Sequence, residues 1–130
     1  MPSRTAIIRG LRTPFAKSGT VFARLTALDL GKMAVTELIE RSGIDPKTIQ
    51  EVVFGNVIPS VKAPNIAREI VLGTGLPRRI PGFTVGEACA SSNQAITSAA
   101  DMIFRPVTPE EMAWHRRDGT LDEPEELPHL

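Results

Sequence analysis

The sequence predicts an α/β protein whose mostly parallel sheet carries helices on both faces. Short runs rich in β-branched residues alternate with longer segments in which apolar residues recur at helical spacing. Parallel strands need a long crossover between them, so this alternation is typical of βαβ units. The chain has 130 residues, of which 42% are hydrophobic, and is long enough for one domain with a single core.

The first predicted strand covers residues 5–9, and the first predicted helix covers residues 27–42. Thr26 and Asp29 have the spacing of a capping box, in which each residue's side chain accepts a backbone N–H of the other. Gly43 suits the position that follows the last helical residue. The apolar side of this helix is expected to consist of Leu30, Met33, Ala34, Leu38 and Ile39.

The middle of the chain predicts a short helical turn, a second strand and a second helix. The dipeptide Asp45-Pro46 combines a capping residue with a proline suited to a first helical position. The second strand is expected at residues 51–54. Pro64 is expected to open the second helix, which ends at Gly73 or Gly75.

The last predicted strand and helix enclose the only cysteine. The strand covers residues 82–85, and a helix rich in small residues is expected from Cys89 to Phe104. A single cysteine excludes an internal disulfide and a cysteine metal cluster. It is consistent with a reducing, cytoplasmic setting.

Charge and hydropathy narrow the function classes. The formal charge is zero, which argues against general nucleic-acid binding, because that needs a basic surplus. No apolar run approaches the roughly 20 residues of a membrane-spanning helix. The first residues lack the apolar stretch of a secretory signal.

The composition changes near residue 105 and predicts two regions. Residues 1–105 carry 13 basic and 8 acidic side chains and form the expected folded domain. Residues 106–130 carry 2 basic and 7 acidic side chains and contain four prolines. Such a segment can bury little apolar surface, so an acidic, proline-containing and mobile tail is predicted there.

The turn before the last helix is the one place where the sequence concentrates reactive chemistry. A strand runs into a tight turn, and Cys89 lies where the helix begins. Unpaired N–H groups at a helix N-terminus can stabilise a thiolate, and they can face the oxyanion that forms when the thiolate attacks a carbonyl. Small neighbouring residues leave room for a substrate. The pattern suits the nucleophile of an acyl transfer.

Each candidate residue also has an ordinary structural interpretation. A lone cysteine is most often a small buried hydrophobic residue, and no histidine lies near Cys89 in the sequence to act as its base. Arg12 and Arg68 suit substrate contact, but a surface or structural ion pair is favoured. Asn56 suits a turn better than a ligand contact, and Asn65 suits a helix cap better than a ligand contact.

Several motifs together resemble the thiolase family in its N-terminal part. The segment Cys-Ala-Ser-Ser-x-Gln-Ala at residues 89–95 is similar to the family's nucleophile motif. Residues 63–75 are especially similar to the thiolase subunits of fatty-acid β-oxidation complexes. Three other segments match the family in order and spacing: residues 12–15, 29–31 and 53–57.

The resemblance implies a fold, a reaction and a role for Cys89. The fold implied is the incomplete first half of a five-layered αβαβα arrangement. Thiolases cleave a 3-ketoacyl-CoA with coenzyme A or run the reverse condensation, and Cys89 matches the cysteine that holds the acyl group as a thioester. The backbone N–H of Cys89 would contribute to the oxyanion hole. Coenzyme A is then a substrate, no metal or redox cofactor is implied, and a homodimer or a complementing thiolase chain is the expected partner.

The resemblance ends near Phe104, and the motifs of the family's second half do not appear. These are an Asn-Glu, a Gly-His-Pro and a Cys-x-Gly motif, which supply a water-holding group, a base and a second cysteine. His115 and His129 lie in no such context. Turnover by this chain alone is therefore expected to be very slow or absent. Three alternatives stay open: a non-catalytic interaction protein of thiolase type, a truncated remnant, and a related condensing enzyme.

Overall fold

The computed structural model describes residues 5–104, which form a small parallel sheet between helices. A two-stranded sheet pairs β1 with β2 in parallel, in the register Val52↔Gly82 to Gly55↔Val85. The elements in chain order are α1 (Ala27–Ser42), the 3-10 turn η1 (Pro46–Thr48), β1 (Val52–Gly55), α2 (Ile66–Gly73), β2 (Gly82–Val85) and α3 (Ser91–Phe104). The α/β class expected from the sequence is confirmed.

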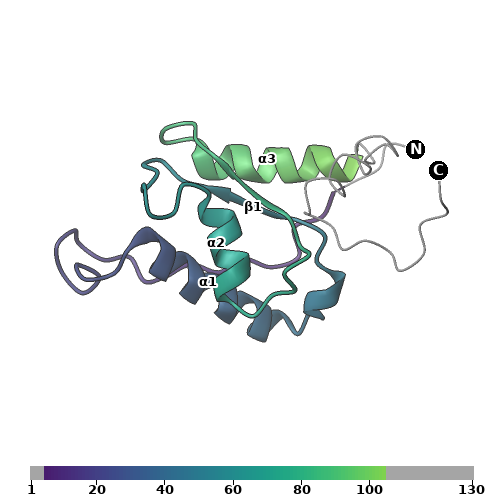
Figure 1. Cartoon of the computed structure of the whole chain (residues 1–130), viewed down its shortest axis with the longest axis horizontal. Coiled ribbons are helices and arrows are strands. Elements are labelled where there is room, and N and C mark those ends of the chain that lie inside the picture. The colour runs from purple at the N-terminus through teal and green to yellow at the C-terminus, as the bar shows by residue number, and fades with distance from the viewer. Residues whose placement is uncertain (1–4, 105–130) are drawn as a thin grey trace.

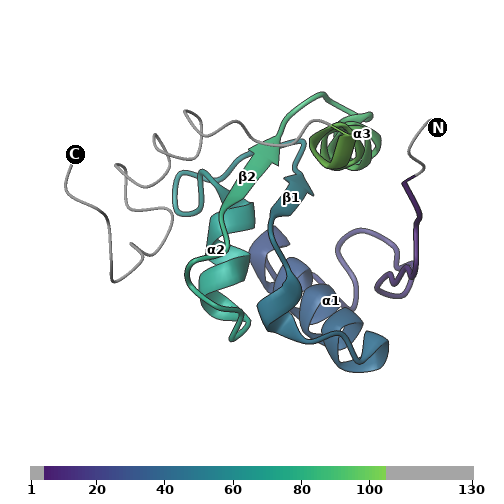
Figure 2. The same cartoon turned by 90° about the vertical axis from the view of Figure 1, so that its right-hand side faces the viewer.

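The helices cover both faces of the sheet. Helix α3 lies along one face of the sheet, and α2 lies against the other face with α1 beside it (Figures 1 and 2). Both strands run in the same direction, so their carboxyl ends meet at one edge, and the chain leaves β2 there to enter α3 (Figure 2). This edge is where open parallel sheets usually carry their sites.

The boundaries of α1 agree with the sequence prediction because local capping sets them. The Thr26 hydroxyl accepts the N–H of Asp29, while an Asp29 oxygen accepts the N–H of Thr26, at 3.1 and 2.9 Å. At the other end, Gly43 adopts a left-handed conformation with φ of 66°, and its N–H donates to the carbonyl of Ile39. Both ends therefore satisfy backbone groups that a helix otherwise leaves unpaired.

The packed face of α1 agrees with the predicted one except at Met33 and Gly31. Leu30, Ala34, Leu38 and Ile39 are partly buried, as expected. Gly31 is the buried residue of this helix, and Val35 and Ile39 pack against the core on the same face. Met33, expected inside, is 52% exposed. A Cβ at Gly31 would lie 2.8 Å from the Cδ1 of Ile70, so the absence of a side chain allows α1 and α2 to approach closely. A pattern that counts only large apolar residues does not include glycine.

The core lies between α2, the sheet and the chain that follows α2. Its fully buried residues are on the inner side of α2 and in the segment leading to β2, and they include Ala67, Ile70, Val71 and Ile80. Helix α2 begins at Ile66, two residues after the predicted start, because the Asn65 side chain accepts the N–H of Arg68 and caps the helix. Asn65 is thus the cap that the sequence favoured.

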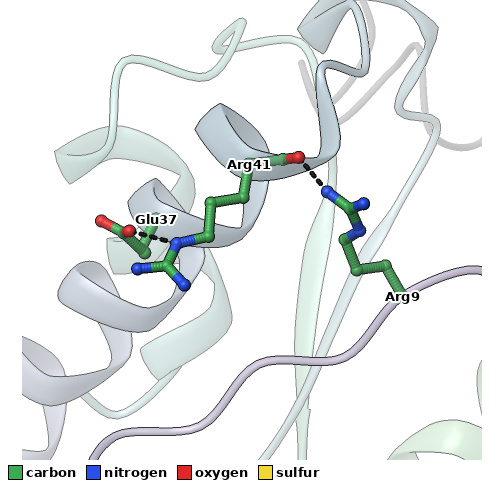
Figure 3. A network of polar contacts seen from close by, with 3 residues as sticks. All are labelled: Arg9, Glu37 and Arg41. Atoms are coloured by element: carbon green, nitrogen blue, oxygen red, sulfur yellow. Dashed lines mark hydrogen bonds and ion pairs between the residues drawn. The ribbon is translucent and has the colours of Figure 1, made fainter.

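The predicted strand at residues 5–9 is not formed. This segment pairs with neither β1 nor β2, and Ile7 and Ile8 are 81% and 91% exposed. Strand propensity is weak and depends on context, and a strand needs a partner for its backbone groups. Instead, the Arg9 guanidinium donates to the backbone carbonyl of Arg41 (Figure 3). The side chain of Arg41 in turn donates to the carboxylate of Glu37. A cation at the carboxyl end of a helix is favourable, so Arg9 fastens the segment to the end of α1.

Two further sequence predictions concern the tail and membrane-spanning helices. The acidic tail predicted at residues 106–130 lies outside the described residues. Within residues 5–104, no helix is long and apolar enough to cross a membrane.

Candidate active site

Cys89 lies in the turn between β2 and α3, at the carboxyl edge of the sheet. Helix α3 begins at Ser91, so the predicted start at Cys89 is wrong by two residues and the cysteine precedes the helix. Asn56 follows β1 at the same edge, where its N–H donates to the carbonyl of Val85 at 2.9 Å. The fold therefore brings the ends of both strands beside the cysteine turn.

The side chain of Ser91 holds this turn together. Its hydroxyl accepts the N–H of Glu87 at 2.9 Å and donates to the carbonyl of Ala88 at 2.7 Å. Ser91 is 1% exposed, so these bonds form away from water. They span both sides of Cys89, and they explain why the helix starts after the cysteine.

The residue before the cysteine has an unusual backbone conformation. Ala88 has φ of 43°, and it is the only non-glycine residue with positive φ among those that the structure describes. This region costs an L-residue roughly 1–2 kcal/mol, so the surrounding contacts must impose it. The hydrogen bonds of Ser91 are such contacts.

Gly55, the last residue of β1, lets the strand lie directly against the start of α3. A Cβ at this position would lie 2.5 Å from the carbonyl carbon of Ser91 and 2.6 Å from the nitrogen of Ser92. Both neighbours are backbone atoms, which cannot rotate away. Any larger residue at position 55 must displace the helix start and, with it, the cysteine turn.

The Cys89 side chain is free and exposed, so the interpretation as a small buried hydrophobic residue is wrong. Two N–H groups at the helix start, those of Ser92 and Asn93, have no hydrogen-bond acceptor within the described part of the chain. Backbone N–H groups of this kind can receive the negative charge of an oxyanion. The turn thus combines an accessible thiol with unpaired donors.

A mainly apolar groove begins beside this turn and runs between α3 and the free edge of β1. Ser92 is at its near end, and Val53 and Phe54 form part of its floor. Several residues along its α3 side leave large apolar surface uncovered, and Ile96 and Ile103 are 56% and 67% exposed. The other α3 residues along the groove are Ala95, Ala99 and Met102.

The two arginine candidates have structural roles of different strength. Arg68 donates to the carbonyls of Arg78 and Ile80 at 2.8 and 2.9 Å, which fixes the segment before β2. Its role is structural as favoured, but through carbonyls rather than an ion pair. Within the described residues, Arg12 donates to the adjacent carbonyl of Thr13 at 3.2 Å and to no other group, and it lies in an exposed segment.

The remaining candidates do not join the cysteine turn. Asn65 supports it indirectly, since its amide donates to the carbonyl of Gly82 and its oxygen accepts the hydroxyl of Thr84, both at 2.8 Å. His115 and His129 lie outside the described residues. Among residues 5–104, no cluster of three or more histidine, cysteine or acidic side chains could hold a metal ion.

Sequence reasoning missed Ser91 and Gly55 as the residues that shape the turn. A serine two positions after the cysteine, and a glycine at the end of a neighbouring strand, are common in loops and carry no specific signal alone. Their roles depend on a contact between segments that are distant in the sequence.

Comparison with known families identifies this arrangement. The family model described as thiolase, N-terminal domain, matches residues 5–106. The chain belongs to the thiolase family. The match covers every described strand and helix, including the cysteine turn.

Similar thiolases are known from several bacteria. A 3-ketoacyl-CoA thiolase from Serratia proteamaculans (strain 568) is 54% identical over 101 residues, which are 78% of this chain and 23% of that protein. A 3-ketoacyl-CoA thiolase from Vibrio cholerae is 53% identical over 101 residues, which again are 78% of this chain and 23% of that protein. The chain therefore spans about a quarter of the length of the curated thiolases that it matches.

Solved thiolase structures share the fold. A thiolase from Ascaris suum in complex with coenzyme A has a TM-score of 0.68 and 34% identity, over 72% of this chain and 25% of that chain. An acetyl-CoA acetyltransferase from Bacillus anthracis has a TM-score of 0.61 and 32% identity, over 64% of this chain and 21% of that chain. The described region is thus an incomplete thiolase domain, as the sequence motifs predicted.

Proposed function

We propose that this thiolase segment supplies the acyl-accepting nucleophile of CoA-dependent acyl transfer, and that Cys89 is that nucleophile. The exposed thiol in a turn before a helix start with unpaired N–H donors carries the proposal. Its relatives are named 3-ketoacyl-CoA thiolases, and one similar structure is a complex with coenzyme A.

The proposed reaction passes the acyl group through a thioester on Cys89. The thiolate attacks the 3-keto carbon of a 3-ketoacyl-CoA, forming a carbon–sulfur bond, and the carbonyl oxygen becomes an oxyanion. Collapse of the oxyanion breaks the bond between carbons 2 and 3, and carbon 2 takes a proton as acetyl-CoA leaves. The thiolate of a free coenzyme A then displaces Cys89, giving a shortened acyl-CoA. The reverse sequence is a condensation.

The donors proposed for the oxyanion are backbone groups of the turn. They are the N–H of Cys89 itself and the unpaired N–H group of Asn93. Fixed donors aimed at a developing charge stabilise it without reorganisation, and loss of one typically costs a hundredfold to a thousandfold in rate, of order 10²–10³. The proposal assigns coenzyme A the role of substrate, with no metal or redox group in the reaction.

Acylation of the purified chain tests this function. The protein is incubated with acetyl-CoA or with a 3-ketoacyl-CoA, and its intact mass is measured with Cys89→Ser as the control. We expect a thioester adduct on the wild type, removed by hydroxylamine at neutral pH, and none on the variant. An unmodified wild-type protein that still gives folded-state circular dichroism would contradict an active nucleophile in this chain.

A second candidate function is non-catalytic pairing with a complementing thiolase chain or with a second copy. The observation that favours it is the groove along α3, where Ile96 and Ile103 leave apolar surface uncovered. Exposed contiguous apolar surface commonly marks an interface. The two functions are compatible, because a partner that covers the groove would lie beside Cys89. A free thiol in either role suits the cytoplasm, which we propose as the compartment.

A further inference from the structure

We propose that Ser91 is a positioning residue for Cys89: its buried hydroxyl locks the cysteine turn and so fixes the direction from which the thiol meets a carbonyl. This inference rests on the proposed function, because it concerns how the same cysteine is used. It assigns a task to a side chain that does not itself touch the reacting atoms.

The Ser91 hydroxyl forms hydrogen bonds with the two residues that precede the cysteine. The hydroxyl oxygen accepts the N–H of Glu87, two residues before the cysteine, and its proton goes to the carbonyl of Ala88, the residue just before it. A serine hydroxyl can accept and donate at the same time, so one side chain fixes both groups. A side chain two residues after the cysteine thus fixes the two residues that precede it.

These bonds hold Ala88 in a conformation that is uncommon for a residue other than glycine. Ala88 has φ of 43°, a backbone conformation that is unfavourable for a residue other than glycine and that persists only when neighbouring contacts impose it. Since the peptide after Ala88 carries the Cys89 nitrogen, a rotation at Ala88 would re-aim the thiol. The Ser91 hydroxyl donates to the Ala88 carbonyl at 2.7 Å and opposes that rotation.

The turn cannot shift as a unit toward the sheet. Gly55 already brings β1 against the backbone of Ser91 and Ser92, with no room for even a methyl group. Ser91 itself is 1% exposed. The hydroxyl is therefore closely packed. If it is removed, a water molecule can replace its hydrogen bonds only if the turn moves away from β1.

The neighbouring serine provides a matched control. Ser92 is exposed, lies in the same first turn of α3, and its hydroxyl makes no hydrogen bond within the described residues. Ser91→Ala and Ser92→Ala remove the same oxygen one residue apart. Only the first removes the contacts on which the inference depends.

The main experiment compares acylation rates of Cys89 in the full chain by time-resolved intact-mass spectrometry with acetyl-CoA. We expect Ser91→Ala to lower the rate about tenfold to a hundredfold, the scale on which a misplaced reacting group loses rate. Ser92→Ala should keep the wild-type rate. Equal rates for Ser91→Ala and Ser92→Ala, both folded, would overturn the inference.

A second readout is independent of acylation and detects positioning directly. Because the chain has one cysteine, labelling with ¹³C-cysteine gives a single spin system. A fixed rotamer gives Hα–Hβ couplings at the limiting values of one staggered conformation. We expect limiting values in the wild type and in Ser92→Ala but intermediate, averaged couplings in Ser91→Ala. A purely structural role would lower the melting temperature and leave the couplings at their limiting values, which would reject positioning. If the wild type takes no acyl group, the proposed function fails, and these couplings still decide the role of Ser91.

If Ser91→Ala does not fold, hydrogen exchange of the wild-type chain tests whether the Ser91 hydroxyl holds the turn rigid. The amide of Glu87, bonded to the Ser91 hydroxyl, should exchange its hydrogen more slowly than the amides of Ser92 and Asn93, which have no acceptor among residues 5–104. Equal exchange at these three amides would show that the turn is not locked, and the inference would be wrong.

Discussion

At the scale of single residues, small side chains decide the geometry around Cys89. Gly55 admits the start of α3, Ala88 takes the conformation that turns the chain, and Ser91 holds it there. None of the three is a chemically reactive group in the proposed mechanism. They set how closely the end of β1 approaches the start of α3 and how the turn between them is folded. Substitutions at these positions therefore test the geometry of the site without removing its reactive group.

Gly55→Ala should destabilise the protein and slow acylation of Cys89. The new methyl group would lie 2.5 Å from backbone carbon, so α3 must move, and overpacking of this kind typically costs about 1–3 kcal/mol. Urea unfolding measures the stability, and intact-mass spectrometry measures the acylation rate. The control is Gly10→Ala, because a Cβ at Gly10 has nothing within 4 Å. Equal behaviour of the two variants would contradict the close approach.

Asn65→Ala should destabilise the protein by about 2 kcal/mol, because it removes a helix cap and two contacts to β2. Asn65→Asp separates these effects: it keeps the acceptor for the Arg68 N–H and loses the donor to the Gly82 carbonyl. Its loss is expected to be smaller. Chemical denaturation measures all three proteins, and an Asn65→Ala variant as stable as the wild type would rule out this network as a link between α2 and β2.

At the scale of elements, local capping sets where α1 and α2 begin, and contacts between elements set which faces pack. The capping box of Thr26 and Asp29 is readable from the sequence and is present in the structure. The packed face of α1 contains most of the predicted residues, but its buried residue is Gly31, which allows a close approach to Ile70. Local patterns thus predict the caps of this helix and most of its packed face, but not the point of closest approach.

The capping box of α1 should make stability depend on acidic pH. The backbone N–H and hydroxyl of Thr26 hold the pKa of Asp29 below its ordinary value. A lowered folded-state pKa gives stabilisation that is present above the unfolded-state pKa and is lost as the pH falls through the folded-state pKa. Asp29→Asn should therefore be less stable than the wild type near neutral pH, and the difference should shrink in acid below about pH 4.

Urea unfolding of both proteins between neutral and acidic pH measures this dependence. Thr26→Ala serves as a second variant, since it removes both hydroxyl contacts while leaving the carboxyl group in place. A stability difference between the wild type and Asp29→Asn that stays constant as the pH falls would contradict the capping role of the carboxylate.

At the scale of the whole molecule, the core is one-sided. Helices α1 and α2 and the chain before β2 enclose most of the buried apolar residues, whereas the α3 side of the sheet is open along the groove. The chain spans about a quarter of the length of the thiolases that it matches. Covering the groove is therefore the event that we expect to complete the environment of Cys89.

A complementing chain should bind this protein through the groove. The chain is co-expressed with a form of the Serratia proteamaculans thiolase that lacks the 101 matching residues, and the pair is isolated by an affinity tag on one member. We expect a stable complex with thiolysis activity, and we expect Ile103→Asp to abolish both. Leu72→Asp, a substitution of an exposed apolar residue on α2, is the control. Loss of binding with both variants, or with neither, would argue against the groove as the interface.

The sequence by itself determined the class of fold, the family and the location of Cys89 between a strand and a helix. Strand and helix alternation, the Thr26–Asp29 box and the motif around Cys89 are local signals, and each is encoded within a few neighbouring residues. These signals place the cysteine between a strand and a helix, although they put the helix start two residues too early.

Only the tertiary structure decided which segments meet. The failure of residues 5–9 to pair, the burial of Gly31 and the contact of Gly55 with the start of α3 all depend on neighbours far along the chain. A strand exists only when another strand satisfies its backbone, and a close contact forms only when both partners lack bulk. The hydroxyl of Ser91 becomes informative for the same reason, since its burial follows from the packing of β1 against α3.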